Sequence, residues 1–117
     1  MVEEIEIRAV SKYVHISPQK VRLVVNQVRG EWVNAALTKL KFMPQAAAGP
    51  VYKAIRSAVA NAEENEGLDR ESLYIARITV DGGPTRRWRR FGARGRFKPI
   101  RRHSSHITVV LKESEIE

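Results

Sequence analysis

The chain has 117 residues, no cysteine and a formal net charge of +8, with a sequence pI of about 10.3. This length suits one domain with a modest core, and the lack of cysteine excludes disulfides, thiolate zinc sites and a cysteine nucleophile. The positive charge indicates a polyanionic partner, which is either nucleic acid or an anionic membrane surface.

The sequence argues against a membrane partner. The amino-terminal segment is acidic and lacks a long apolar run, unlike a secretory signal or a basic presequence. No stretch approaches the ~20 apolar residues that a membrane span requires. Peripheral membrane proteins usually carry their charge on an amphipathic helix, whereas the arginines here lie in an extended segment interrupted by Gly and Pro. We therefore expect a cytoplasmic protein that binds nucleic acid and does not contact membranes.

The chain opens with a predicted strand and a predicted helix. Apolar and charged residues alternate within residues 2–14, which predicts a strand that pairs with the C-terminal strands. Ser17 and Pro18 then predict a helix start, because serine can cap free N–H groups and proline fits the first turn. Gly30 predicts the helix end. The apolar residues of this helix are Val21, Leu23, Val24, Val25 and Val28.

Two further helices are predicted next. The first covers residues 32–43 and is closed by Pro44. The second covers residues 45–64, but Pro50 lies inside it, where a proline costs ~3 kcal/mol. We expect one helix that kinks near residues 46–49, and the alternative is a helix that begins at Pro50. Its apolar stripe consists of Val51, Ile55, Ala58, Val59 and Ala62, and that of the preceding helix consists of Ala35, Ala36, Leu37, Leu40 and Phe42.

Two short strands complete the predicted domain, over residues 73–80 and 106–111. Both are rich in β-branched residues and free of Gly and Pro, and Asp69 is positioned to cap a turn before the first. The order of elements predicts one α+β domain over residues 1–117, in which three helices pack on a small antiparallel three-stranded sheet. The residues expected to face the core are Tyr74, Ala76, Ile78, Val80, Ile107, Val109 and Leu111.

A strongly basic segment separates these two strands. Residues 82–112 contain ten Lys or Arg residues and no Asp or Glu, so nearly all of the excess charge lies here. Two strands joined by a Gly-containing stretch predict a long protruding β-hairpin over residues 82–105, with its tip near residues 91–95. At ~3.3 Å per residue, arms of ~10 residues reach roughly 30 Å, which is long enough to enter a large partner.

The hairpin provides the candidate binding residues. Guanidinium groups suit phosphate because they present a planar, permanently charged fork of donors, and aromatic rings can stack on unpaired bases. The alternatives are a solvated charged loop for the arginines and packing on the neighbouring arm for Trp88 or Phe97. The predicted RNA-binding residues of the hairpin are Arg86, Arg87, Trp88, Arg89, Arg90, Phe91, Arg94, Gly95, Arg96, Phe97, Lys98, Arg101 and Arg102. Lys20 and Arg22, near the positive end of the first helix, are also predicted to contact phosphate, with a solvated helix face as the alternative.

Catalysis has little support in the sequence. His103 and His106 are three residues apart in an extended segment, so they belong to opposite faces, and no carboxylate stands nearby to orient an imidazole. Glu63, Glu64 and Glu66 are typical of a solvated acidic patch. We therefore predict no enzymatic activity, no metal and no cofactor. A DNA-binding regulator that uses a β-ribbon is the alternative, although such dimeric readers need a self-complementary interface and only a short ribbon.

Several sequence blocks in a fixed order resemble the L-twenty-two family of large-subunit ribosomal proteins. They run from Val10 to Leu111 and therefore cover nearly the whole chain. The blocks are SPQKVRLV from Ser17, RG from Arg29, SAVANAEEN from Ser57, DGGPT from Asp81, GR from Gly95 and HITV from His106.

The resemblance implies a structural component of the large ribosomal subunit. It implies a domain near the outer opening of the peptide exit tunnel and a hairpin that runs through ribosomal RNA and helps to line the tunnel. It also implies a part in early subunit assembly. The expected partners are large-subunit ribosomal RNA, neighbouring large-subunit proteins and the nascent peptide, and the free protein is expected to be a monomer.

Overall fold

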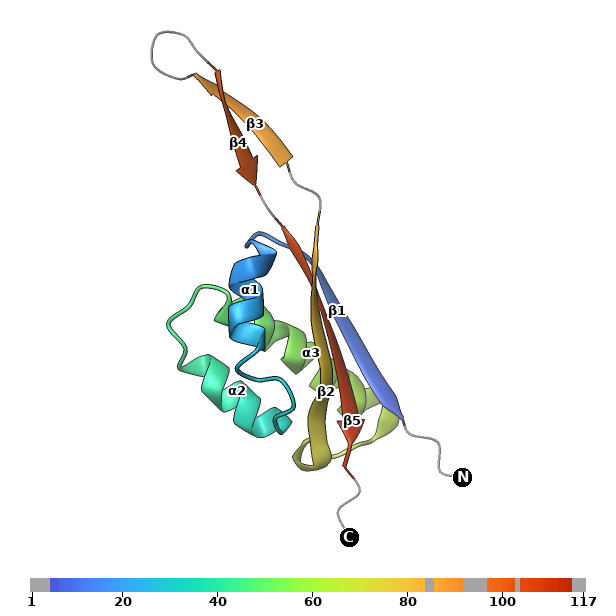
Figure 1. Cartoon of the computed structure of the whole chain (residues 1–117). Coiled ribbons are helices and arrows are strands. Elements are labelled where there is room, and N and C mark those ends of the chain that lie inside the picture. Colours follow the sequence, from blue (N-terminus) through green and yellow to red (C-terminus); the bar gives the residue numbers. More distant parts are fainter. Residues whose placement is uncertain (1–4, 84–85, 92–96, 103, 115–117) are drawn as a thin grey trace.

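The computed structural model describes residues 5–83, 86–91, 97–102 and 104–114. Its elements follow the predicted order, with an α+β domain from which a two-stranded hairpin protrudes (Figure 1). The elements are β1 (Glu6–Val14), α1 (Pro18–Val25), α2 (Val33–Lys41), α3 (Ala48–Glu66), a 3-10 turn (Arg70–Ser72), β2 (Leu73–Gly82), β3 (Arg86–Phe91), β4 (Phe97–Arg102) and β5 (Ser105–Glu113).

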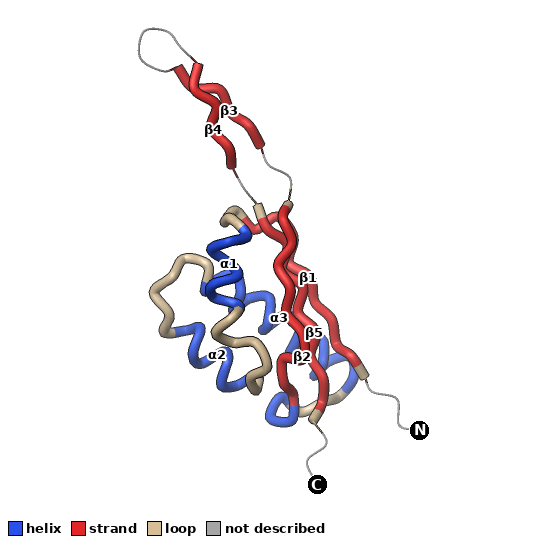
Figure 2. The backbone as a smooth tube through the Cα atoms, in the orientation of Figure 1, coloured by secondary structure: helices blue, strands red, loops and turns tan. Residues whose placement is uncertain are grey.

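A three-stranded antiparallel sheet organises the domain, with the strand order β1-β5-β2. The amino-terminal strand pairs with the carboxy-terminal strand as predicted, with Ile7 opposite Leu111. On the other side of β5, Ile78 of β2 lies opposite Val109. The three helices lie on one face of this sheet, and no helix of the described chain covers the other face (Figure 2). The sheet therefore has one buried face and one open face.

The core lies between the helices and the buried face of the sheet. The predicted stripe of α3 is confirmed, because Val51, Ile55, Ala58, Val59 and Ala62 are all buried. Full burial of each of the valine and isoleucine side chains contributes about 1.5–3 kcal/mol to folding. The strands supply Ile7, Ala9, Leu73, Ile75, Ile78, Val80, Ile107, Val109 and Leu111 to the same cluster.

One part of the predicted core face is wrong. Tyr74 and Ala76 are only partly buried, and Leu73 and Ile75 occupy the core instead. The cause is a β-bulge, since the register with β5 shifts between Ile75 and Arg77. A bulge inserts one extra residue into a strand and therefore reverses the face of the residues on one side of it.

The first two helices are shorter than predicted. α1 ends at Val25, and single-turn hydrogen bonds such as Val28 N–H to Val25 O (3.1 Å) continue the chain to Gly30, where φ is 78°. Val28 lies after the end of α1 but is fully buried, so the apolar residues continue to face the core beyond the helix. Leu23 and Phe42 were expected on apolar stripes, but they are 63% and 79% exposed. Ala35 is also exposed.

The predicted kink in the third helix is also wrong. α3 begins at Ala48, so Pro50 lies in its first turn. The backbone N–H groups of a first turn have no partner within the helix, and a proline there loses no hydrogen bond. The helix ends at Glu66, and the next residue, Gly67, has a left-handed φ of 63°, which is typical of a helix C-cap.

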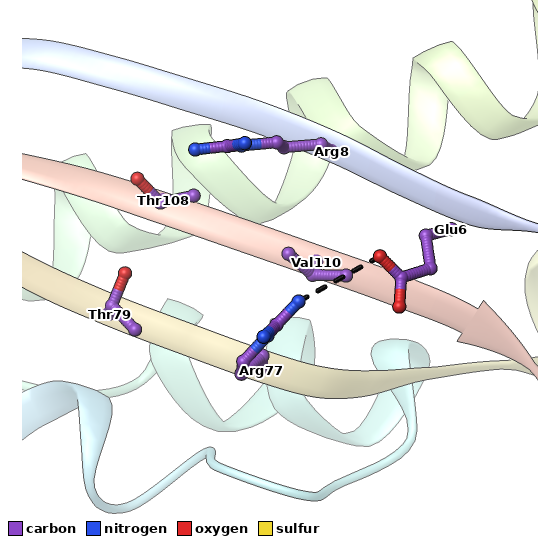
Figure 3. A pocket seen from close by; sticks show the side chains of 6 residues that line it. All are labelled: Glu6, Arg8, Arg77, Thr79, Thr108 and Val110. Atoms are coloured by element: carbon purple, nitrogen blue, oxygen red, sulfur yellow. Dashed lines mark ion pairs between the residues drawn. The ribbon is translucent and has the colours of Figure 1, made fainter.

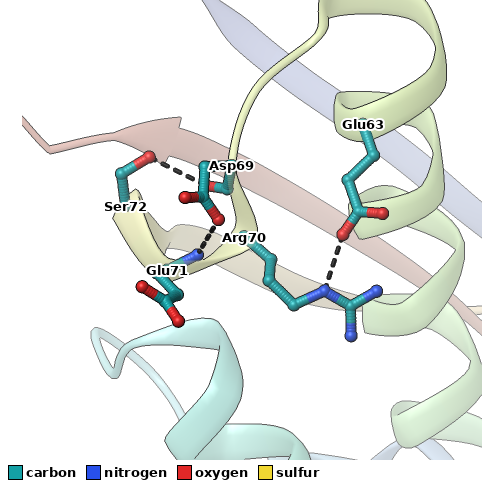
Figure 4. A network of polar contacts seen from close by, with 5 residues as sticks. All are labelled: Glu63, Asp69, Arg70, Glu71 and Ser72. Carbon is teal, nitrogen blue, oxygen red and sulfur yellow. Dashed lines mark hydrogen bonds and ion pairs between the residues drawn. The ribbon is translucent and has the colours of Figure 1, made fainter.

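The connection from α3 to β2 is a short polar turn (Figure 4). The predicted cap is confirmed, because the Asp69 carboxylate accepts a hydrogen bond from the Glu71 backbone N–H at 3.1 Å. The Arg70 Nε–H donates to Glu63 at 2.6 Å, and this carboxylate raises the pKa of the Arg70 guanidinium. Glu63 is thus part of a surface ion pair at the end of the helix.

Candidate nucleic-acid interface

The hairpin gives the molecule its elongated shape. β2 and β5 leave the sheet side by side and lead into β3 and β4, which extend well beyond the domain (Figure 1). The principal extents are 69 × 28 × 21 Å and the radius of gyration is 17.6 Å, whereas a compact domain of about this size has a radius near 13 Å. The backbone therefore carries the basic segment away from the core.

The register of the hairpin places like charges opposite one another. Arg86 pairs with Arg102, Arg87 with Arg101, and Arg90 with Lys98. Like charges directly opposite each other destabilise a strand pair, and a two-stranded ribbon has no core to offset that cost. The two apolar cross-strand pairs are Trp88 with Ile100 and Phe91 with Phe97. The arrangement is suited to a polyanion that lies against the ribbon.

Successive positions along a strand alternate between the two faces of a ribbon, so Arg86 and Arg87 belong to opposite faces. Arg89, which pairs with Pro99, shares a face with Arg87. Both faces of the ribbon therefore contain arginine positions. The predicted tip lies largely outside the described residues, as do the predicted site residues Arg94, Gly95 and Arg96 and the histidine His103.

The base of the hairpin is a closely packed junction. The Gly83 backbone N–H donates to the Ser104 carbonyl at 2.9 Å, and the Ser105 hydroxyl donates to the Ile16 carbonyl at 2.5 Å. Ser105 is fully buried and Ser104 is 8% exposed. A Cβ atom added to Gly83 would lie 2.3 Å from the Ser104 Oγ. A side chain at this position would therefore force the Ser104 hydroxyl to move.

The model of the family described as "Ribosomal protein L22p/L17e" matches residues 9–112. The chain belongs to this family. A relative named "Large ribosomal subunit protein uL22" from Thermoanaerobacter sp. (strain X514) is 50% identical over 110 residues, which is 94% of this chain and 99% of the relative. A relative with the same name from Synechococcus sp. (strain JA-3-3Ab) is 50% identical over 96% of this chain and 91% of the relative. Another, from Desulfotalea psychrophila (strain LSv54 / DSM 12343), is 50% identical over 93% of this chain and 99% of the relative. The L22p/L17e family is one of structural ribosomal proteins, so the predicted family is confirmed.

In this L22p/L17e family member, Arg22 has a partner within the protein. Its Nη2 donates to the carbonyl of Val80 at 2.9 Å, which ties α1 to the end of β2 next to the hairpin base. Lys20 lies on the same helix and is exposed. The geometry therefore supports a positioning role for Arg22, and it leaves Lys20 accessible to a ligand.

Sequence reasoning missed a second contact at the hairpin base. The backbone N–H of Tyr13 donates to Nδ1 of His106 at 3.1 Å, and the two rings meet edge to face with centroids 5.0 Å apart. Tyr13 has a φ of 58°, at the register shift of β1 between Ser11 and Val14. His106 thus supports a bulge in β1, and neither the bulge nor its partner follows from periodicity.

The described residues contain no group of three or more His, Asp or Glu side chains placed to hold a metal ion. None of the helices in the described ranges combines the length and the apolar character that crossing a bilayer requires.

The Gly83 junction leads to a stability prediction. Gly83→Ala is expected to lower the free energy of unfolding by about 1–3 kcal/mol, because the new methyl group forces Ser104 out of its packed position. Gly82→Ala is the matched control, since its Cβ would meet only the Pro18 Cγ at an ordinary 3.8 Å. Urea unfolding of both variants measures the difference, and equal midpoints would contradict the packing described for the junction.

Proposed function

We propose that this chain is a structural component of the large ribosomal subunit that binds large-subunit ribosomal RNA through its basic hairpin. The observation that carries the proposal is the register of β3 and β4, which sets cation opposite cation at three of the six cross-strand pairs. Such a ribbon gains most from a partner that supplies phosphate to both faces, as RNA does when it surrounds an inserted element. The names of the relatives, "Large ribosomal subunit protein uL22", identify which RNA to test.

The hairpin supplies the contacts that position the protein on RNA. Arginine–phosphate contacts fix register and orientation and carry little sequence information, so specificity comes from the shape of the RNA around the ribbon. Each neutralised phosphate also releases counterions and adds to the salt dependence of binding. The proposed RNA-binding set comprises the hairpin residues predicted above together with Lys20.

The length of the hairpin supports a proposal about where the domain and the hairpin lie in the subunit. The longest extent of the molecule, 69 Å, exceeds twice the next one, 28 Å, and β3 and β4 extend well beyond the domain (Figure 1). We propose that the domain stays near the surface of the subunit, where it contacts neighbouring large-subunit proteins. The hairpin then reaches the wall of the peptide exit tunnel, where its tip meets the nascent peptide. Binding that connects distant RNA segments in this way also assists subunit assembly, and it requires only one copy of the chain.

Sedimentation of the tagged chain from a cell lysate through a high-salt gradient tests the proposal. We expect the chain to migrate with the large ribosomal subunit, because contacts buried within folded RNA are screened less by salt than surface charges are. A chain that stays at the top of the gradient and binds duplex DNA would overturn the proposal in favour of a DNA-binding regulator.

A further inference from the structure

The open face of the sheet carries a groove that none of the hairpin residues line (Figure 3). Its volume is about 250 Å³, and it crosses all three strands on the side opposite the helices. Its lining residues are Glu6 and Arg8 of β1, Arg77 and Thr79 of β2, and Thr108 and Val110 of β5.

The register of the sheet arranges these residues in rows. Arg8 and Arg77 both pair with Val110, so the two arginines flank it on either side. Neighbouring strands lie about 4.8 Å apart, which separates the backbones of the two arginines by roughly 10 Å. Val110 is only 6% exposed although no helix covers it, which is consistent with arginine stems that lie over it. In the next row, Thr79 pairs with Thr108.

Of the two arginines that line the groove, only Arg77 forms an ion pair with a described residue. Glu6 lies 3.8 Å from Nη2 of Arg77 and 3.5 Å from Nζ of Lys112. The side chains of Glu6 and Arg77 are 47% and 63% exposed, and such long, exposed ion pairs hold their partners weakly. The Arg8 side chain has no hydrogen bond or ion pair with another described residue, and it extends along β1 away from Glu6 (Figure 3). Two cations, Arg77 and Lys112, therefore share the Glu6 carboxylate, and the Arg8 guanidinium remains available.

We propose that this groove is a second RNA-binding site, which takes a backbone phosphate of the ribosomal RNA between Arg8 and Arg77. The paired hydroxyls of Thr79 and Thr108 are the further donors that a phosphate oxygen requires. The proposal rests on the proposed function and extends it from the hairpin to the domain.

The position of the groove favours RNA as its occupant. β2 and β5, which form two of its three walls, are the strands that lead into the hairpin. An RNA held along the hairpin therefore has a continuous strand surface on which to reach the groove. Contacts of these side chains with phosphate would position the RNA without reading its sequence.

Paired substitutions test this site in the full-length chain. We compare Arg8→Gln/Arg77→Gln with Lys53→Gln/Arg56→Gln, which makes the same change in net charge at positions of α3 outside the groove. Binding to a transcript of the large-subunit ribosomal RNA is measured at several salt concentrations. For the groove variant we expect roughly an eight-fold weaker affinity at 0.1 M salt and a salt slope lower by about 0.9 for each phosphate that the variant no longer neutralises.

Glu6→Gln supplies a test in the opposite direction. Removing this carboxylate should tighten binding, whereas Glu64→Gln, at an exposed position of α3, should change it less. Equal losses from the groove pair and the α3 pair would overturn the proposal, because they would reflect net charge alone. Full affinity in the groove pair would overturn it as well. If the unaltered chain failed to bind the transcript, the proposed function itself would fail, and the two failures are thereby distinguished.

Discussion

A variant with residues 83–104 replaced by an Asn-Gly turn is expected to lose affinity for large-subunit ribosomal RNA by roughly 10³-fold or more at low salt. The replacement removes nine Lys or Arg residues and no Asp or Glu. Each phosphate that these residues neutralise contributes about 0.7–0.9 to the salt slope, so the slope should fall by several units. Titration of the transcript at increasing salt measures both quantities.

The shortened domain should still fold. Gly82 and Ser105 are register partners, so a two-residue type I′ turn can close the strands between them. Among the residues whose burial is described, none of the buried cluster lies within residues 83–104, so the shortened chain keeps the whole of that cluster. A full-length variant with the nine cations changed to Gln separates charge from length. Unaltered affinity in the shortened chain would show that the domain alone binds RNA.

Ile55→Ala is expected to have the largest effect on stability, with a loss of about 2–5 kcal/mol. Ile55 is fully buried on the face of α3 that packs against the sheet, so its truncation leaves a cavity and removes apolar packing. The whole domain is held by only about 5–15 kcal/mol, so this loss is a large fraction of its stability. Urea unfolding followed by circular dichroism measures the change.

Leu23→Ala is the matched control for the core variant. Leu23 lies on α1 and is 63% exposed, so its truncation should change the free energy of unfolding by no more than about 0.5 kcal/mol. Similar losses in the two variants would contradict the division between core and surface described for the helices.

The sequence predicts the elements of this fold well because their periodicity reflects burial. The stripe of α3 through Val51, Ile55 and Val59 is apolar at helical spacing and is buried along its length. The sequence does not show whether Pro50 kinks a helix or lies in its first turn, because this depends on where the helix begins, and no N-cap side chain signals the start at Ala48. A helix boundary of this kind is set by packing with the rest of the domain.

Pairing between distant strands explains most of what the sequence leaves open. In β2 the apolar residues of the core face lie at odd positions, 73 and 75, before the bulge and at even positions, 78 and 80, after it. This change of parity is the only sign of the bulge in the sequence of β2. The charge of the hairpin is evident in the sequence because its residues are contiguous. The groove on the open face is not, because Arg8 and Arg77 become neighbours only through their shared partner Val110.

Ultraviolet crosslinking of assembled large subunits tests most directly whether the hairpin carries the contact with RNA. A protease that cuts after glutamate would release residues 72–113 as one peptide, because no glutamate lies between Glu71 and Glu113. We expect mass spectrometry to find ribosomal RNA adducts mainly in this peptide and to place them within residues 82–105. Adducts confined to peptides from the helices, with residues 82–105 unmodified, would contradict the account.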